Sequence, residues 1–181
     1  MKIAILSDAH DNVWNLTAAT QHIQHTDALI FCGDISAPFM LTILAKNYAN
    51  PIHMVFGNND GDRFNLMGKA NMYDHVTLYG EVMNIELAGK RFYVNHYPEI
   101  ALEVARGGEF DVICYGHDHE YNIVQHEDYL IINPGTIMGF APRKMADCDS
   151  TFVIYDTVSN RIESFKIISE NDEKRVIAYG N

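Results

Sequence analysis

Two histidines, His117 and His119, stand two residues apart at a point where a buried strand should end. They lie in the stretch CYGHDHEYN, which follows the apolar run FDVI. Taken alone, the stretch is equally compatible with a polar turn and with a metal site, because short motifs often match by accident. Similar polar clusters follow other apolar runs of the chain. Together they carry seven side chains able to bind a metal ion: Asp8, His10, Asp34, Asn58, His96, His117 and His119.

The apolar runs before these clusters have the character of buried strands. IAIL, ALIFC, HMVF and DVICY hold four or five residues with no apolar–polar alternation, which is typical of strands covered on both faces. Helical patterns lie between them, beginning near residues 12, 38 and 98, and two glycines at 107 and 108 stop the third. After residue 129 we expect an antiparallel meander, because TFVIYDTVSNRIESFKII reads as two strands around a Ser-Asn turn.

This pattern predicts an α/β fold with mixed sheets. In open α/β sheets ligands bind outside the carboxyl ends of the strands, so the seven side chains should converge there. The other five histidines have no such position and are expected to be ordinary core or surface residues: His22, His25, His53, His75 and His126. With no repeat or linker in the sequence, residues 1–181 should form a single domain.

Composition and charge disfavour several classes of partner. A formal net charge of -11 disfavours nucleic acid and anionic membranes, which are bound through clustered Lys and Arg. No apolar run approaches the length of a membrane span, and the first residues are too short for a signal-peptide core. Three unpatterned cysteines are expected to be free thiols, so we expect a cytoplasmic location.

The ordered motifs resemble those of the calcineurin-like metallophosphoesterases, in particular the small single-domain phosphodiesterases of bacteria and archaea. That family carries D-x-H, G-D, G-N-H-[DE], a later histidine and G-H-x-H, in this order. The corresponding residues are Asp8-Ala9-His10, Gly33-Asp34, Gly57-Asn58-Asn59-Asp60, His96 and Gly116-His117-Asp118-His119. The resemblance covers the chain from residue 1 to about residue 136, where Asn133-Pro134-Gly135-Thr136 is similar to the N-P-G-S of small members.

The resemblance implies a metallophosphoesterase-like four-layer α/β/β/α sandwich with two mixed sheets and a binuclear metal site. It places Asp8, His10 and His119 on one ion and Asn58, His96 and His117 on the other, with Asp34 bridging the two. It therefore implies that the two histidines of CYGHDHEYN bind different ions, although their spacing alone suggests one. Imidazole and carboxylate ligands without thiolate suit manganese, iron, nickel or zinc, and manganese is the metal we expect first.

The implied activity is hydrolysis of a small phosphate ester, most simply a phosphodiester. The attacking group would be a hydroxide bridging the two metals, and Asp34, Asn58 and His96 would be the catalytic residues. The positive charge of two metals would offset the acidity of the chain locally and admit a small phosphate ester. The sequence leaves homo-oligomerisation open.

Two residues depart from the family pattern. Asn59 stands where the family has a histidine that resembles a general acid, and an amide cannot donate a proton in that way. Tyr97 stands where many members have glycine, and we expect it to pack over the site. Arg143 is a candidate phosphate contact, although a solvated loop arginine is the more ordinary interpretation.

Two other functions are known for proteins with related motifs. The retromer subunit with this fold exemplifies a metal-binding protein-interaction scaffold with little or no catalysis, and the absence of histidine at Asn59 favours that alternative. The complete ligand set favours an enzyme. A nuclease similar to the DNA-repair members is disfavoured because the sequence has no basic clusters.

Overall fold

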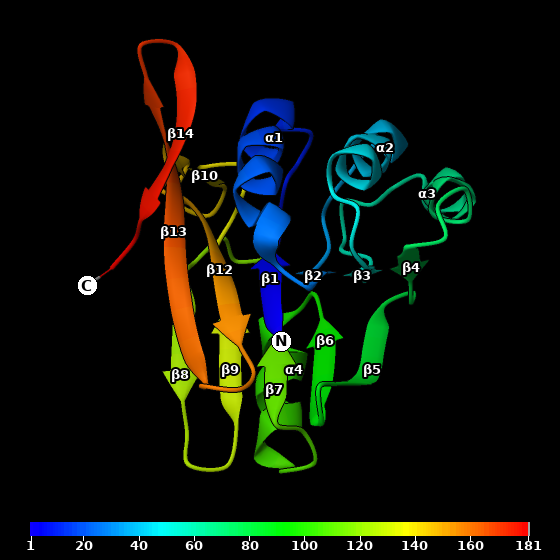
Figure 1. Cartoon of the computed structure of the whole chain (residues 1–181), viewed down its shortest axis with the longest axis vertical. Helices are drawn as coiled ribbons and strands as arrows, with labels where there is room; N and C mark the ends of the chain where they lie inside the picture. The colour runs from blue at the N-terminus through cyan, green and yellow to red at the C-terminus, as the bar shows by residue number, and fades with distance from the viewer. Residues whose placement is uncertain (181) are drawn as a thin grey trace.

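The chain folds into four layers, two β-sheets between two layers of helices, in a computed structural model that describes residues 1–180 (Figure 1). The first layer contains α1 (Val13–His22), α2 (Pro38–Asn47) and α3 (Arg63–Ala70), with a 3-10 turn, η1 (Ile23–His25), after α1. The fourth layer is α4 (Pro98–Arg106). This arrangement confirms the predicted α/β/β/α fold.

The second layer is a seven-stranded mixed sheet in the order β14-β13-β12-β1-β2-β3-β4. Its parallel part consists of β1 (Lys2–Leu6), β2 (Ala28–Phe31), β3 (Ile52–Met54) and β4 (Val76–Leu78). Its antiparallel part consists of β12 (Ser150–Asp156), β13 (Arg161–Glu170) and β14 (Glu173–Ala178). Because α1, α2 and α3 connect successive parallel strands, the helix starts and the strand ends share one edge of this sheet.

The third layer is a five-stranded mixed sheet in the order β5-β6-β7-β9-β8. It contains β5 (Val82–Leu87), β6 (Lys90–Asn95), β7 (Val112–Cys114), β9 (Leu130–Asn133) and β8 (Asn122–Gln125). Strands β6, β7 and β9 are parallel, whereas β5 and β8 pair antiparallel at the two edges. A separate small hairpin is formed by β10 (Phe140–Ala141) and β11 (Ala146–Asp147).

Alternate side chains of β1 pack into two different cores, which explains why this strand has no polar alternation. Ala4 and Leu6 face the helices α1 to α3, and Ile3 and Ile5 face the five-stranded sheet. All four side chains are fully buried. A strand between two apolar layers must be apolar on both faces.

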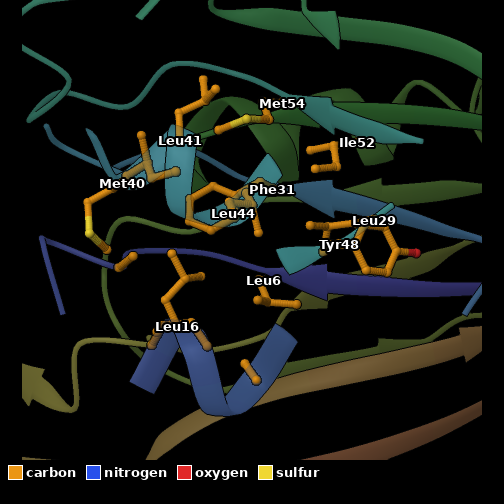
Figure 2. Close-up of a cluster of buried hydrophobic side chains, with 14 of the residues drawn as sticks. Leu6, Leu16, Leu29, Phe31, Met40, Leu41, Leu44, Tyr48, Ile52 and Met54 are labelled. Atoms are coloured by element: carbon orange, nitrogen blue, oxygen red, sulfur yellow. The ribbon is translucent and has the colours of Figure 1, made fainter. Parts of the chain in front are cut away.

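The core under the helices is drawn in Figure 2. Leu16 of α1 and the α2 residues Leu41 and Leu44 lie against Leu6 and Phe31 of the sheet. These five side chains are almost entirely removed from water, each worth about 1.5–3 kcal/mol of burial. This packing holds the N-terminal ends of α1 and α2 at the sheet edge that carries the polar clusters.

The three predicted helices are present. The Asn12 side chain caps α1 by accepting a hydrogen bond from the Asn15 backbone at 3.1 Å. Pro38 is the first residue of α2 and Pro98 the first of α4, where a missing backbone N–H costs nothing. Helix α4 ends at Arg106, one residue before the first of its two glycines.

One expectation about secondary structure was wrong, and several elements were not predicted. The meander expected after residue 129 holds for β12 to β14, but β9 belongs to the other sheet and runs parallel to β7. Helix α3 and strands β4, β5, β8 and β14 were not predicted. Their sequences are short or largely exposed, so they lack the apolar signal that identifies buried elements. In residues 1–180 no helix combines the length and apolarity that crossing a membrane requires.

Candidate metal centre

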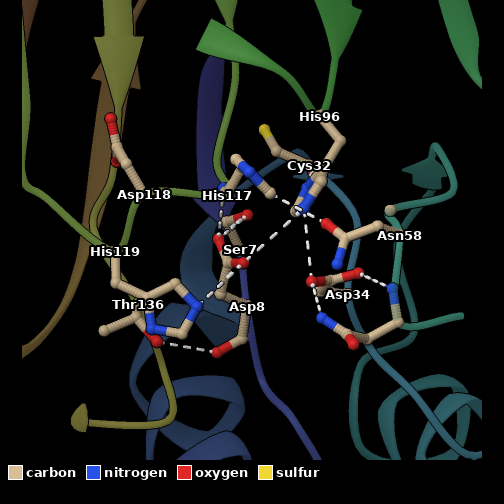
Figure 3. A network of polar contacts seen from close by, with 12 residues as sticks. Ser7, Asp8, Cys32, Asp34, Asn58, His96, His117, Asp118, His119 and Thr136 are labelled. Carbon is tan, nitrogen blue, oxygen red and sulfur yellow. Dashed lines mark hydrogen bonds and ion pairs between the residues drawn. The ribbon is translucent and has the colours of Figure 1, made fainter. Parts of the chain in front are cut away.

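The seven candidate ligands all lie in loops that follow strands. The strands are β1, β2 and β3 of one sheet and β6 and β7 of the other. Backbone hydrogen bonds join the loops to one another. The Asp8 N–H donates to the Gly33 carbonyl at 3.0 Å, and the Gly116 N–H donates to the His96 carbonyl at 3.1 Å. The tertiary structure thus brings both sheets to one site (Figure 3).

Left-handed backbone conformation recurs at the candidate ligands. Asp8, His10, Asp34, His117 and His119 have φ values of 54°, 41°, 58°, 75° and 61°. This region is uncommon for residues with a side chain, and such strain clusters at functional sites because the surrounding structure must hold it. In this chain five of the seven candidate ligands have this conformation, so the strained positions coincide with the site.

Two motif positions must be glycine because their backbone lies very close to the aspartate side chains. A Cβ atom on Gly57 would overlap the Asp34 carboxylate, and one on Gly116 would overlap Asp8 Oδ2 and the Ser7 hydroxyl. These contacts explain why glycine precedes Asn58 and His117 in the sequence.

The first group of ligating atoms comes from Asp8, His10 and His119. The Nε2 atoms of the two histidines lie 3.1 Å apart, and Asp8 Oδ1 lies 3.3 Å from His119 Nε2 and 3.6 Å from His10 Nε2. Asp8 Oδ1 is buried and has no hydrogen-bond partner. The three atoms therefore converge on a point where a cation would satisfy all of them.

The second group includes Asp34 and His96. Asp34 Oδ2 lies 3.2 Å from His96 Nε2 and 3.5 Å from His10 Nε2, so this carboxylate faces a histidine from each predicted set. Asp8 also reaches this side, with Oδ1 at 3.8 Å from His96 Nε2. Buried His96 Nε2 has no hydrogen-bond partner.

Asn58 and His117 complete the predicted set at the exposed rim. His117 Nδ1 lies 2.8 Å from Asn58 Oδ1, and the His117 ring centroid is 5.2 Å from that of His96. His119 Nε2 instead faces Asp8 and His10. The two histidines of the CYGHDHEYN stretch thus have different partners, which supports their assignment to different ions.

Backbone carbonyls orient two of the imidazoles. His96 Nδ1 lies 2.8 Å from the Cys32 carbonyl and His119 Nδ1 lies 2.6 Å from the Phe140 carbonyl. A carbonyl only accepts, so each Nδ1 must carry the proton it donates, which leaves the Nε2 lone pair directed into the site. Such outer hydrogen bonds are the usual means of fixing a metal-binding histidine.

The four central groups favour one another's charged forms. Burial raises the pKa of Asp8, but the close approach of the His10 and His119 imidazoles and the charge of nearby imidazoles outweigh it and lower the pKa overall. The pKa of Asp34 is also lowered, because contacts with His96 and Asn59 outweigh burial. Burial lowers the pKa of His96 and His119, but the carboxylates outweigh it and raise both.

Metal binding should therefore become stronger as the pH rises through the neutral range. Raised pKa values keep more of His96 and His119 protonated near neutrality, and a cation must displace those protons. Calorimetric titration with Mn²⁺ should give a lower Kd at about pH 8 than at about pH 6, with net proton release to the buffer. Equal affinity at both values, with no proton release, would contradict this coupling.

The hydrogen bonds made by two motif residues, Asn59 and Asp60, were not anticipated. The Asn59 side chain donates to Asp34 Oδ2 at 2.8 Å and its backbone N–H donates to Oδ1 at 2.7 Å. The buried Asp60 carboxylate accepts from the backbone N–H groups of Asp34, Ser36 and Gly57 at 2.7 to 3.0 Å. Both residues belong to the G-N-N-D motif, so the signal was present, but the spacing does not indicate which groups they would contact.

Tyr97 and Arg143 stand at the margin of the site. The Tyr97 ring centroid lies 5.3 Å from that of His117 and 5.4 Å from that of His96, in agreement with packing over the site. Arg143 is exposed. Its charge contributes after burial and His96 to lowering the pKa of His117, so it acts on the site electrostatically.

The remaining five histidines lie elsewhere in the described chain. His22 and His25 lie at the end of α1 and in η1, and His53 lies in β3 with Nδ1 at 2.9 Å from the Tyr79 hydroxyl. His75 and His126 lie in turns beside β4 and β8. Within residues 1–180, none of the five is part of a potential metal-binding group.

Comparison with known proteins identifies the family. The calcineurin-like phosphoesterase superfamily domain matches residues 1–160. The phosphodiesterase MJ0936 of Methanocaldococcus jannaschii is 32% identical over 144 residues, which cover 77% of this chain and 86% of the relative. The motifs of the sequence and the comparison thus agree on an enzyme that acts on phosphate esters.

Solved structures give the same result for the fold. An archaeal phosphodiesterase structure superposes with a TM-score of 0.81 at 29% identity, covering 92% of this chain and 99% of that one. Vacuolar protein sorting 29 of Cryptosporidium parvum superposes with a TM-score of 0.70 at 17% identity, covering 98% and 96% of the two chains, and shows the fold alone. With most of its length matched and the motif residues gathered at one site, the chain belongs to the calcineurin-like phosphoesterase superfamily, and it is a hydrolase of phosphate esters.

Proposed function

We propose that this protein is a binuclear metal-dependent phosphodiesterase acting on a small diester. The observation that carries the proposal is the convergence of buried, unpartnered ligand atoms. Asp8 Oδ1 and His96 Nε2 have no hydrogen-bond partner, and His10 and His119 direct Nε2 atoms at each other. An unpaired buried polar atom is costly, and a bound cation removes that cost.

The residues divide into two proposed sets that share Asp34. Asp8, His10 and His119 would hold one divalent cation, and Asn58, His96 and His117 the other, with manganese as the proposed metal. When bound, two such cations would activate water and withdraw charge from the phosphoryl group. Asp34 would hold the two sets together, since its Oδ2 faces His10 and His96.

Substrate access is provided by the rim of the site. Asn58 and Asn59 are exposed, whereas Asp8, Asp34 and His96 are buried beneath them. A phosphoryl group would therefore approach past the two asparagines, with Asn58 at the metals and Asn59 holding Asp34. A compact diester fits such an approach, and the acidity of the chain disfavours a polyanion such as a nucleic acid.

The alternative function, a protein-interaction scaffold, does not explain the features of the metal centre. Oriented histidines and left-handed backbone at five of the seven ligands carry an energetic cost, and a protein-binding surface does not require them.

The buried free thiols Cys32 and Cys114 support a reducing cytoplasm as the proposed location. We propose that residues 1–181 act as one domain.

Reconstitution with Mn²⁺ should yield close to two metal equivalents per chain. The two groups of ligating atoms give one cation each, and Asp34 and Asp8 link them. Elemental analysis after removal of free metal measures the content, and bis-p-nitrophenyl phosphate hydrolysis should rise with the second equivalent. A firm ceiling near one equivalent would refute the binuclear site.

A further inference from the structure

A cavity of about 390 Å³ opens beside the candidate metal centre. His119 forms part of its wall, so the cavity and the metal centre share a side chain. The remaining wall comes from segments far apart in the sequence: Glu120 and Tyr121 after β7, the β10–β11 hairpin from Ala141 to Cys148, Asp149 and Thr151 at β12, and Tyr179 after β14. The proposed chemistry at the metals leaves this cavity unassigned.

The charges around the cavity are paired within the protein. Lys144 Nζ lies 2.9 Å from Glu120 Oε1, and Asp149 Oδ1 lies 3.5 Å from Lys166 Nζ. No cationic side chain among the described wall residues is therefore free to bind a second phosphate. The carboxylates of Glu120 and Asp149 would also repel an anion while accepting hydrogen bonds from hydroxyl or amide groups.

Two aromatic rings line the same cavity. The rings of Tyr121 and Tyr179 pack edge to face, with centroids 5.1 Å apart and ring planes inclined by 82°. The Tyr121 hydroxyl forms a hydrogen bond of 2.8 Å with the Ser164 hydroxyl, which holds the ring in place. Ring faces beside hydrogen-bond acceptors suit a flat or cyclic group that carries hydroxyls.

We infer that this cavity binds one ester substituent of the diester, an uncharged hydroxyl-bearing ring group such as a nucleoside. The inference rests on the proposed function and deepens it, because it names the substrate class that the metal centre would receive. The volume exceeds what a methyl or ethyl ester would fill, and the paired charges disfavour a substituent with further phosphates. The substrate is then a nucleoside-type or sugar-type phosphodiester.

Cys148 provides a direct probe of the cavity. Its side chain lines the wall and is half-buried, whereas Cys32 and Cys114 are fully buried in the core. Burial raises the pKa of the Cys148 thiol, so alkylation by N-ethylmaleimide belongs at mildly alkaline pH. A maleimide adduct on Cys148 would occupy the cavity while leaving every candidate metal ligand untouched.

Two p-nitrophenyl diesters with the same leaving group separate the cavity from the metal centre. With Mn²⁺ bound, kcat/KM for the thymidine 5′-phosphate p-nitrophenyl ester should exceed that for methyl p-nitrophenyl phosphate by at least about tenfold. Alkylation of Cys148 should abolish that advantage and leave the methyl ester unchanged. The matched control, Cys148→Ser treated with the same reagent, should retain the advantage.

Ligand protection tests the cavity independently of turnover. Thymidine 5′-monophosphate should slow alkylation of Cys148 in the Mn²⁺-loaded protein severalfold, measured by mass spectrometry, while methyl phosphate should not. Equal kcat/KM for the two esters together with no protection would overturn the inference. Protection without hydrolysis of either ester would keep the binding site and refute the proposed enzymatic function instead.

Discussion

Asp34→Asn should lower kcat/KM by at least about a hundredfold, which is the upper end of the usual loss when a metal-site residue is changed. The amount of bound metal should fall as well. Asp34 Oδ2 faces His10 and His96, one histidine from each proposed ion. The substitution keeps the shape of the side chain but removes its negative charge, so both cations lose an anionic ligand at once. Metal content by elemental analysis and hydrolysis of bis-p-nitrophenyl phosphate should fall in parallel.

Two control variants distinguish this effect from a general loss of stability. Asp128→Asn makes the same chemical change in an exposed turn, and His25→Ala removes a histidine outside the site. Both should retain near-normal turnover and metal content. If Asp34→Asn did the same, with both cations retained, the bridging role would be wrong and Asp8, which also lies near both groups, would be the remaining shared ligand.

Asn59→His should raise kcat/KM for diesters with poor leaving groups, by up to about 10²–10⁴-fold, the usual contribution of a positioned general acid. An alkoxide needs a proton as it departs, whereas nitrophenolate leaves without one. The wild-type rate should therefore fall steeply as the leaving-group pKa rises, and the variant should flatten that dependence while gaining little on nitrophenyl esters. The measurement is kcat/KM across a leaving-group series with Mn²⁺ bound.

The contact between Asn59 and Asp34 calls for a second variant. Asn59 donates two hydrogen bonds to that carboxylate, one from its side chain. Asn59→Ala removes the side-chain bond without supplying an acid, so it should lower rates evenly across the series and leave the slope unchanged. Comparison of the alanine and histidine variants separates the loss of this contact from the gain of a proton donor.

Two results would redirect the interpretation of Asn59. A shallow slope in the wild type would mean that another group supplies the proton, and Tyr97, packed against His117 and His96, is the neighbour to test with Tyr97→Phe. Complete inactivity toward the activated diester, with two cations bound, would favour the scaffold over the enzyme.

The sequence by itself determined the chemical groups and the elements that carry them. Buried strands such as β1 and β2 are short apolar runs whose ends are marked by a change to polar residues, and that change is local. Helices α1, α2 and α4 were equally readable, because a capping side chain or a proline marks each start. The candidate ligands were identifiable for the same reason: residue type and order relative to a strand end are properties of a short segment.

The tertiary structure decided what those groups face. His10 and His119 meet at 3.1 Å across 109 residues of chain, and the orienting carbonyls of Cys32 and Phe140 carry no mark in the sequence. The cavity beside His119 is lined in part by Tyr179, which follows a polar edge strand that the apolar pattern did not reveal. Such contacts depend on strand pairing and layer packing between distant segments, where the free energy comes from long-range burial and not from local preference.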